Sequence, residues 1–128
     1  MASPTVHLHS CLLSLAIDAK ECRDVATANV VGAYLLADMN DFVMVKVTSE
    51  SVDMMCRVRP EYKKHVIMEK SGKVLYLRLT KALYGCMQSA LLWYNTFKEA
   101  LLKMGFVLNS YNPCVANKVI QGHQCTIC

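Results

Sequence analysis

Four basic side chains crowd into one short stretch of the chain. They are Arg57, Arg59, Lys63 and Lys64, and His65 follows them directly. Cations at this density can bind the phosphates of a nucleic-acid backbone, and each such contact makes affinity more sensitive to salt. A solvated protein surface carries the same cluster, and this is the simpler interpretation. The cluster is therefore a candidate nucleic-acid-binding surface with a purely structural alternative.

A glycine-containing turn offers a second place for chemistry. Gly32 and Ala33 lead into Tyr34-Leu35-Leu36, a pattern that predicts a turn followed by a short helix. Backbone N–H groups at a turn or helix start suit an anion such as phosphate. A buried strand and turn with a packed tyrosine is the structural alternative here.

The segment His123-Gln124-Cys125-Thr126-Ile127-Cys128 contains residue types that bind zinc or exchange electrons. Its Cys-x-x-Cys spacing supplies half of a zinc site, and no second closely spaced Cys/His pair accompanies it. A thioredoxin-like motif would start a helix after a strand. Alternating apolar positions of a strand explain the segment better, so we predict no metal site.

Composition favours a packed chain and restricts its setting. Of 128 residues, 54% are hydrophobic and 19% charged, which argues against disorder and for a single unit over residues 1–128 without a linker. The net charge of +4 permits a nucleic-acid partner without requiring one. Seven cysteines in a chain with no signal-peptide pattern indicate reduced thiols. No apolar run reaches the roughly 20 residues of a membrane span. We expect an intracellular protein, cytoplasmic or nuclear, that is not secreted and has no membrane partner.

Hydrophobic periodicity and turn residues predict an α+β chain. Helices are predicted over residues 4–20, with Ser3 as N-cap, and over residues 51–56 and 87–104, the last ended by Gly105. Strands are predicted over residues 23–31, 42–47, 66–68 and 74–79, with a hairpin turn at residues 70–73. Residues 114–128 form two extended runs around Gln121-Gly122, which we interpret as a hairpin whose second strand is cut short.

The most specific pattern is Lys81-Ala82-Leu83-Tyr84-Gly85-Cys86-Met87-Gln88 followed by Trp93-Tyr94. Lys-x-Leu-Tyr-Gly-x-x-Gln with Trp-Tyr five residues later resembles a signature of the reverse transcriptases of copia-type retrotransposons. The resemblance implies a partial right-hand polymerase, with fingers and the first part of the palm, incomplete at the C-terminus. It implies two-metal phosphoryl transfer with Mg²⁺, a primed RNA or DNA template and deoxynucleotides. The remainder of a retrotransposon polyprotein would be a partner in a longer frame.

A second match lies in Asn29-Val30-Val31-Gly32-Ala33-Tyr34-Leu35, which resembles the family's Asp-hydrophobic-x-x-Ala-Phe/Tyr-Leu. The resemblance places Asn29 at the first metal-binding aspartate and Gly32 and Ala33 against the triphosphate. It places Tyr34 under the incoming sugar, where it excludes a 2′-hydroxyl, and Gln88 near the nucleotide and template base. An alternative register starts at Asp24, but it loses the aromatic five residues later.

These matches predict an inactive chain. Mg²⁺ binds through hard, mostly anionic oxygens, and the neutral amide of Asn29 supplies no charge. The family's Tyr-x-Asp-Asp turn does not occur in these residues. We therefore expect the Mg²⁺ of the family not to bind productively here.

Further departures lie on either side of the aromatic pair. The family's Gln-Ala-Pro-Arg reads Gln88-Ser89-Ala90-Leu91, and Asn112 replaces an aspartate before Pro113-Cys114. Two alternatives to a polymerase fragment follow: a non-catalytic nucleic-acid-binding remnant, or a decayed element copy with no molecular function.

Overall fold

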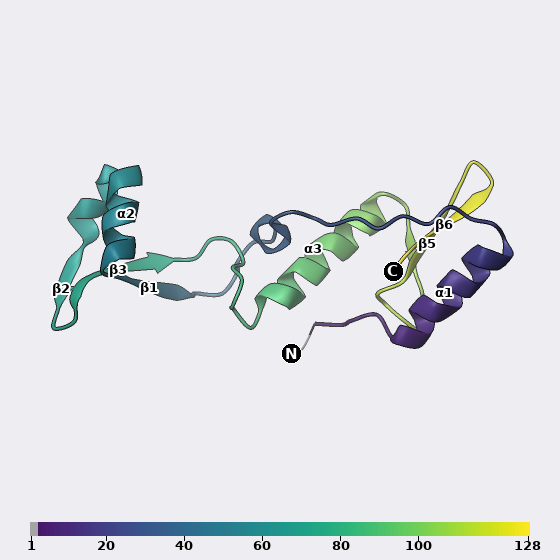
Figure 1. Cartoon of the computed structure of the whole chain (residues 1–128), viewed down its shortest axis with the longest axis horizontal. Helices are drawn as coiled ribbons and strands as arrows, with labels where there is room; N and C mark the ends of the chain where they lie inside the picture. Colours follow the sequence, from purple (N-terminus) through teal and green to yellow (C-terminus); the bar gives the residue numbers. More distant parts are fainter. Residues whose placement is uncertain (1–2) are drawn as a thin grey trace. The chain divides into compact units, whose positions relative to one another are not determined.

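The described part of the chain contains two three-stranded antiparallel sheets and three α-helices. Figure 1 labels the helices and most of the strands. The computed structural model describes residues 3–128. These residues group into two compact units: unit 1 holds the residues up to Ala37 together with Ala82–Cys128, and unit 2 holds Asp38–Lys81. The prediction of an α+β chain with antiparallel sheets is confirmed.

Unit 2 is a small sheet covered by one helix. Its strands are β1 (Met44–Thr48), β2 (Ile67–Glu69) and β3 (Gly72–Arg78), in the order β1-β3-β2. Helix α2 (Glu50–Val58) and the 3₁₀-helix η2 (Pro60–His65) connect β1 to β2. Val52 and Cys56 of α2 are buried against Leu75 of β3. Leu75 faces this core, whereas the next side chain, Tyr76, points to the opposite face of the strand and is exposed.

The predicted hairpin of unit 2 is confirmed. Glu69 pairs with Gly72, so Lys70-Ser71 is a two-residue loop. Gly72 has a φ of +113°, which a residue with a side chain rarely adopts. The predicted helix over residues 51–56 is also confirmed, and Pro60 explains its end because Arg59 is forced into an extended conformation.

Unit 1 combines two helices with the second sheet. It contains α1 (Leu8–Lys20), the 3₁₀-helix η1 (Ala33–Leu36), α3 (Ser89–Lys103), β4 (Val107–Leu108), β5 (Ala116–Ile120) and β6 (His123–Ile127). The sheet order is β4-β5-β6. Leu101, Phe106 and Ala116 form its core, and Cys125 and Ile127 of β6 pack against them. The interpretation of the Cys-x-x-Cys segment as a strand is confirmed.

Two glycines explain where α3 ends and where the chain turns in the last hairpin. Gly105 (φ +84°) donates its N–H to the Leu102 carbonyl, and Phe106 donates its N–H to the Leu101 carbonyl. These are the two hydrogen bonds of a Schellman motif. Gln121 and Gly122 both have positive φ, as the type I′ form of a two-residue hairpin loop requires. The expectation of a shortened second strand was wrong, since β6 pairs with β5 over all five of its residues.

Three further expectations need correction. Helix α1 begins at Leu8 rather than residue 4, and its N-cap is His7, while the Ser3 hydroxyl donates to the carbonyls of Pro4 and Ala90. Helix α3 begins at Ser89, not at Met87. Residues 23–31 form no strand, because no described strand pairs with them, and Val31 is 88% exposed. Strand β4 was not predicted.

The described part of the chain has no helix that is both long and apolar enough to cross a membrane.

Candidate functional site

The two segments that carry the family resemblance meet in unit 1. Tyr34 of η1 lies against Tyr84, with ring centroids 4.5 Å apart and ring planes 30° apart. Helix α3 also packs against η1. In the sequence, only the resemblance suggests that residues 32–36 and 82–94 lie close together. The structure places them side by side in unit 1.

Gly32 sets the entry into η1. Its backbone is left-handed (φ +64°), and its carbonyl accepts a hydrogen bond from the Leu35 N–H at 2.8 Å. The Tyr34 carbonyl accepts from Ala37 at 3.0 Å, which closes the short helix. The predicted turn into a short helix is thus confirmed, and it holds Ala33 and Tyr34 in one fixed turn.

A buried serine shapes the other half of the site. The Ser89 hydroxyl donates to the Leu83 carbonyl at 2.6 Å and accepts from the Leu83 N–H at 3.1 Å. Its side chain is fully buried. Both bonds fix the loop that contains Tyr84 and Gly85 (φ +95°) and ends at Gln88, directly before α3. Sequence reasoning treated Ser89 only as a departure from the family and missed this role.

The aromatic side chains of α3 contact other residues of unit 1. Trp93 stacks on Phe97 with centroids 5.5 Å apart. The Tyr94 hydroxyl donates to the Pro113 carbonyl at 3.2 Å, and burial raises the pKa of Tyr94, with the Cys114 thiol adding to the effect. Trp93 and Tyr94 therefore act as helix-packing aromatics. Tyr84 differs, because its side chain is 60% exposed.

Asn29 lies on an exposed segment without regular secondary structure, five residues before Tyr34. Asp24, the alternative start of the motif, lines a different cleft, with Glu21 and with His123 of β6. Among residues 3–128, no group of three or more His, Cys, Asp and Glu side chains could hold a metal ion.

The basic cluster belongs to unit 2, on α2 and η2. Arg57 and Arg59 are exposed, and so are Lys63 and Lys64. Arg59 forms an ion pair with Glu61 at 3.4 Å. Arg57 is one turn from Asp53, whose pKa is lowered first by a hydrogen bond from Lys73 and then by the nearby positive charges. The structure brings the four predicted cations to one pair of adjacent elements.

Asn112 is a second residue whose role the sequence did not reveal. It is 4% exposed, its Oδ1 accepts from the Cys114 N–H at 3.1 Å, and its Nδ2 donates to Ser10 Oγ at 2.9 Å. An amide can make both kinds of bond, whereas a carboxylate could not donate to the serine. Asparagine therefore fits this buried position in its own right.

The comparisons with known proteins identify no relative. No family model, no curated protein and no solved structure matches the chain.

Proposed function

We propose that this chain is part of a reverse transcriptase of the copia type, with unit 1 contributing palm and unit 2 contributing fingers. The observation that carries the proposal is the contact between Tyr34 and Tyr84. The family resemblance assigns both neighbourhoods to the side of the polymerase that holds the incoming nucleotide. A polymerase needs those two segments to be adjacent, and a chance pair of motifs has no such requirement.

The nucleotide would lie over η1 and the start of α3. Gly32 and Ala33 would face the triphosphate, Tyr34 the sugar, and Gln88 the base. Tyr34 is only partly buried, so its ring combines support from Tyr84 with a surface open to a ligand. A rigid ring at the sugar would penalise a ribonucleotide, whose 2′-hydroxyl needs additional space.

The 128-residue chain would not polymerise by itself. Asn29 brings a neutral amide to the position of a metal-binding carboxylate, and Tyr-x-Asp-Asp does not occur in the sequence. Purified protein should extend no primer with Mg²⁺ or Mn²⁺. The Asn29→Asp variant should be equally inactive, because it restores one carboxylate of three. Reproducible extension by either protein would contradict this part of the proposal.

Nucleotide discrimination tests the proposal without requiring catalysis. The wild-type chain should bind dUTP about tenfold more tightly than UTP, a difference of about 1.4 kcal/mol, because the two ligands differ only in the 2′-hydroxyl. Tyr34→Phe keeps the ring and should keep the preference. Tyr34→Ala should abolish it. Equal affinities for the two nucleotides in the wild-type chain would overturn the proposal.

The exposed basic cluster favours a second candidate function, a non-catalytic remnant that binds nucleic acid through unit 2. Arg57, Lys63 and Lys64 are all open to solvent on neighbouring elements. Such binding would be weak, independent of sequence and sensitive to salt. This binding does not depend on Tyr34, so variants of Tyr34 and variants of the basic cluster distinguish the two candidate functions.

A further inference from the structure

A groove in unit 1 lies apart from the proposed nucleotide site at Tyr34. It has a volume of about 370 Å³ and lies between α1 and the β5–β6 hairpin. Leu13 and Ile17 line it from the helix, and Asn117, Gln124 and Thr126 line it from the sheet. The volume is within the range of small-molecule sites, which is roughly 300–1,000 Å³.

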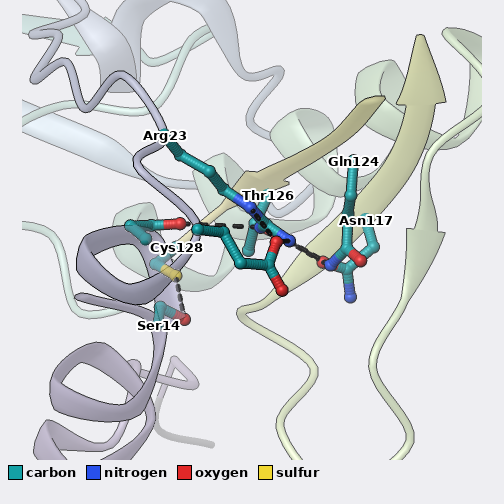
Figure 2. A network of polar contacts seen from close by, with 8 residues as sticks. Ser14, Arg23, Asn117, Gln124, Thr126 and Cys128 are labelled. Carbon is teal, nitrogen blue, oxygen red and sulfur yellow. Dashed lines mark hydrogen bonds and ion pairs between the residues drawn. The ribbon is translucent and has the colours of Figure 1, made fainter. Parts of the chain in front are cut away.

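The three sheet residues form one hydrogen-bonded network (Figure 2). Gln124 Nε2 donates to Asn117 Oδ1 and to Thr126 Oγ1, both at 3.2 Å. The Thr126 hydroxyl donates to Asn117 Oδ1 at 2.8 Å. Asn117 and Thr126 are direct cross-strand partners, so the β5–β6 register fixes the network.

The network determines which hydrogen-bond donors and acceptors remain available to a ligand. Both N–H bonds of Gln124 and both lone pairs of Asn117 Oδ1 are used. Within the described chain, the donor Nδ2 of Asn117 and the acceptor Oε1 of Gln124 are left without a partner. The sheet therefore offers one amide donor and one amide acceptor to the groove.

Charge excludes an anion as the natural ligand. Arg23, the cation that lines the groove, donates from Nε to Glu21 at 2.8 Å and from Nη2 to the same carboxylate at 2.5 Å. Its Nη1 lies 3.5 Å from Asp18. A guanidinium paired in this way with two carboxylates has little charge and few N–H donors available to bind a phosphate. The groove is suited to a neutral ligand.

An exposed aromatic ring completes the site. Tyr111 also lines the groove, and its side chain is 94% exposed. A ring in this position can stack on a flat ligand. Leu13 and Ile17 supply apolar contacts for the rest of the ligand's surface.

We propose that this groove binds a nucleobase. A nucleobase is planar and neutral, and it presents a hydrogen-bond acceptor beside a donor on one edge. A nucleobase holds this acceptor and donor side by side in one rigid ring, and the same ring supplies a flat face for Tyr111. Asn117 would donate to the base carbonyl, Gln124 would accept its ring N–H, and Tyr111 would stack on its face. The site shares no residue with the proposed nucleotide site at Tyr34.

Uridine is the simplest probe. We expect saturable binding in equilibrium dialysis at concentrations up to about 10 mM, with little dependence on salt because the ligand is neutral. Uridine methylated at its ring N–H should bind at least about tenfold more weakly, since it cannot donate to Gln124. This ligand comparison leaves the protein unchanged. Equal affinity for the two nucleosides, or no binding of uridine, would overturn the proposal.

Protein variants give the matched test. Asn117→Asp removes the donor and should weaken uridine binding about tenfold. Asn95→Asp makes the same chemical change on the exposed side of α3 and should leave binding unchanged. Equal loss in both variants would contradict the assignment.

A short oligouridylate shows whether the natural ligand is a base within a strand or a free nucleoside. If the oligouridylate binds more tightly than uridine and is equally sensitive to methylation, the ligand is a base within a strand. If both bind equally, the ligand is a free nucleoside.

Discussion

The Ser89 hydroxyl and the backbone of Leu83 form a closed pair of hydrogen bonds, one donated at 2.6 Å and one accepted at 3.1 Å. Ser89 begins α3, and Leu83 begins the loop that contains Tyr84. The pair therefore ties the most specific motif of the chain to the helix that follows it. Ser89 itself is fully buried.

Ser89→Ala should lower the free energy of unfolding by about 1–3 kcal/mol, because it removes both hydrogen bonds to Leu83 and leaves only the Leu83 carbonyl with a partner, the Cys86 N–H. Urea denaturation measures the change. Ser110→Ala is a control at an exposed position of the same unit and should change stability by less than about 0.5 kcal/mol. Equal effects of the two substitutions would contradict the structural role of Ser89.

Tyr34 and Tyr84 should be energetically coupled. An aromatic pair at 4.5 Å is worth about 0.5–1.5 kcal/mol beyond its buried area. A double-mutant cycle with Tyr34→Ala and Tyr84→Ala should return a coupling energy of this size. The same cycle with Tyr34 and the distant, exposed Tyr111 should return none. Additive effects for Tyr34 and Tyr84 would show that the two motifs do not meet in solution.

Two ion pairs make unit 2 sensitive to pH. Lys73 donates to Asp53 at 2.8 Å and Lys46 donates to Glu69 at 2.7 Å, and these hydrogen bonds are the largest cause of the lowered pKa of each carboxyl. Because the folded pKa is lowered, each pair stabilises the fold above the unfolded pKa, about 3.9 for Asp and 4.3 for Glu. The stabilisation is lost as the pH falls through the folded pKa.

Carboxyl titration by NMR measures this effect directly. The pKa of Asp53 should lie below that of an unfolded aspartate, and Lys73→Met should raise it toward the ordinary value. Lys70→Met removes a nearby lysine for which the structure shows no ion pair with Asp53, and it should have a smaller effect. Both pairs are exposed, so the shifts should shrink in high salt. An unshifted Asp53 in the wild-type protein would contradict the ion pair.

The basic cluster makes a separate prediction. Neutralising Arg57, Lys63 and Lys64 together should weaken binding to an RNA–DNA duplex and reduce the dependence of affinity on salt, because fewer phosphates are contacted. Fluorescence anisotropy across a salt series measures both quantities. Neutralising Lys20, Lys98 and Lys103 of unit 1 removes the same charge and controls for net charge alone. An identical response of the two triple variants would leave the cluster without a specific role.

Local signals predicted most of unit 2 and the turn of the last hairpin correctly. Gly72 and Gly122 mark the two hairpin turns, because glycine readily adopts the positive φ that both positions have. Residues 23–31 were assigned wrongly for a physical reason. Their β-branched composition is a local property, whereas a strand exists only if another strand supplies backbone hydrogen bonds, and none of the described strands does.

The candidate site was predictable in part. The turn at Gly32 and the short helix at Tyr34 follow from local sequence. The contact between Tyr34 and Tyr84 follows only from the fold or from the family resemblance. Ser89 and the Asn117–Gln124–Thr126 network could not be found from sequence, because their roles depend on burial and on the cross-strand register.

The most direct test of the central proposal is to map a deoxynucleotide onto the chain by amide chemical shifts. Deoxyuridine serves as the reference, because it carries the same base and sugar without the phosphates. dUTP, but not deoxyuridine, should shift the amides of Gly32, Ala33 and Tyr34, and a response at Gln88 should accompany them. A dUTP titration that leaves all four unchanged would contradict the assignment of this site to a reverse transcriptase.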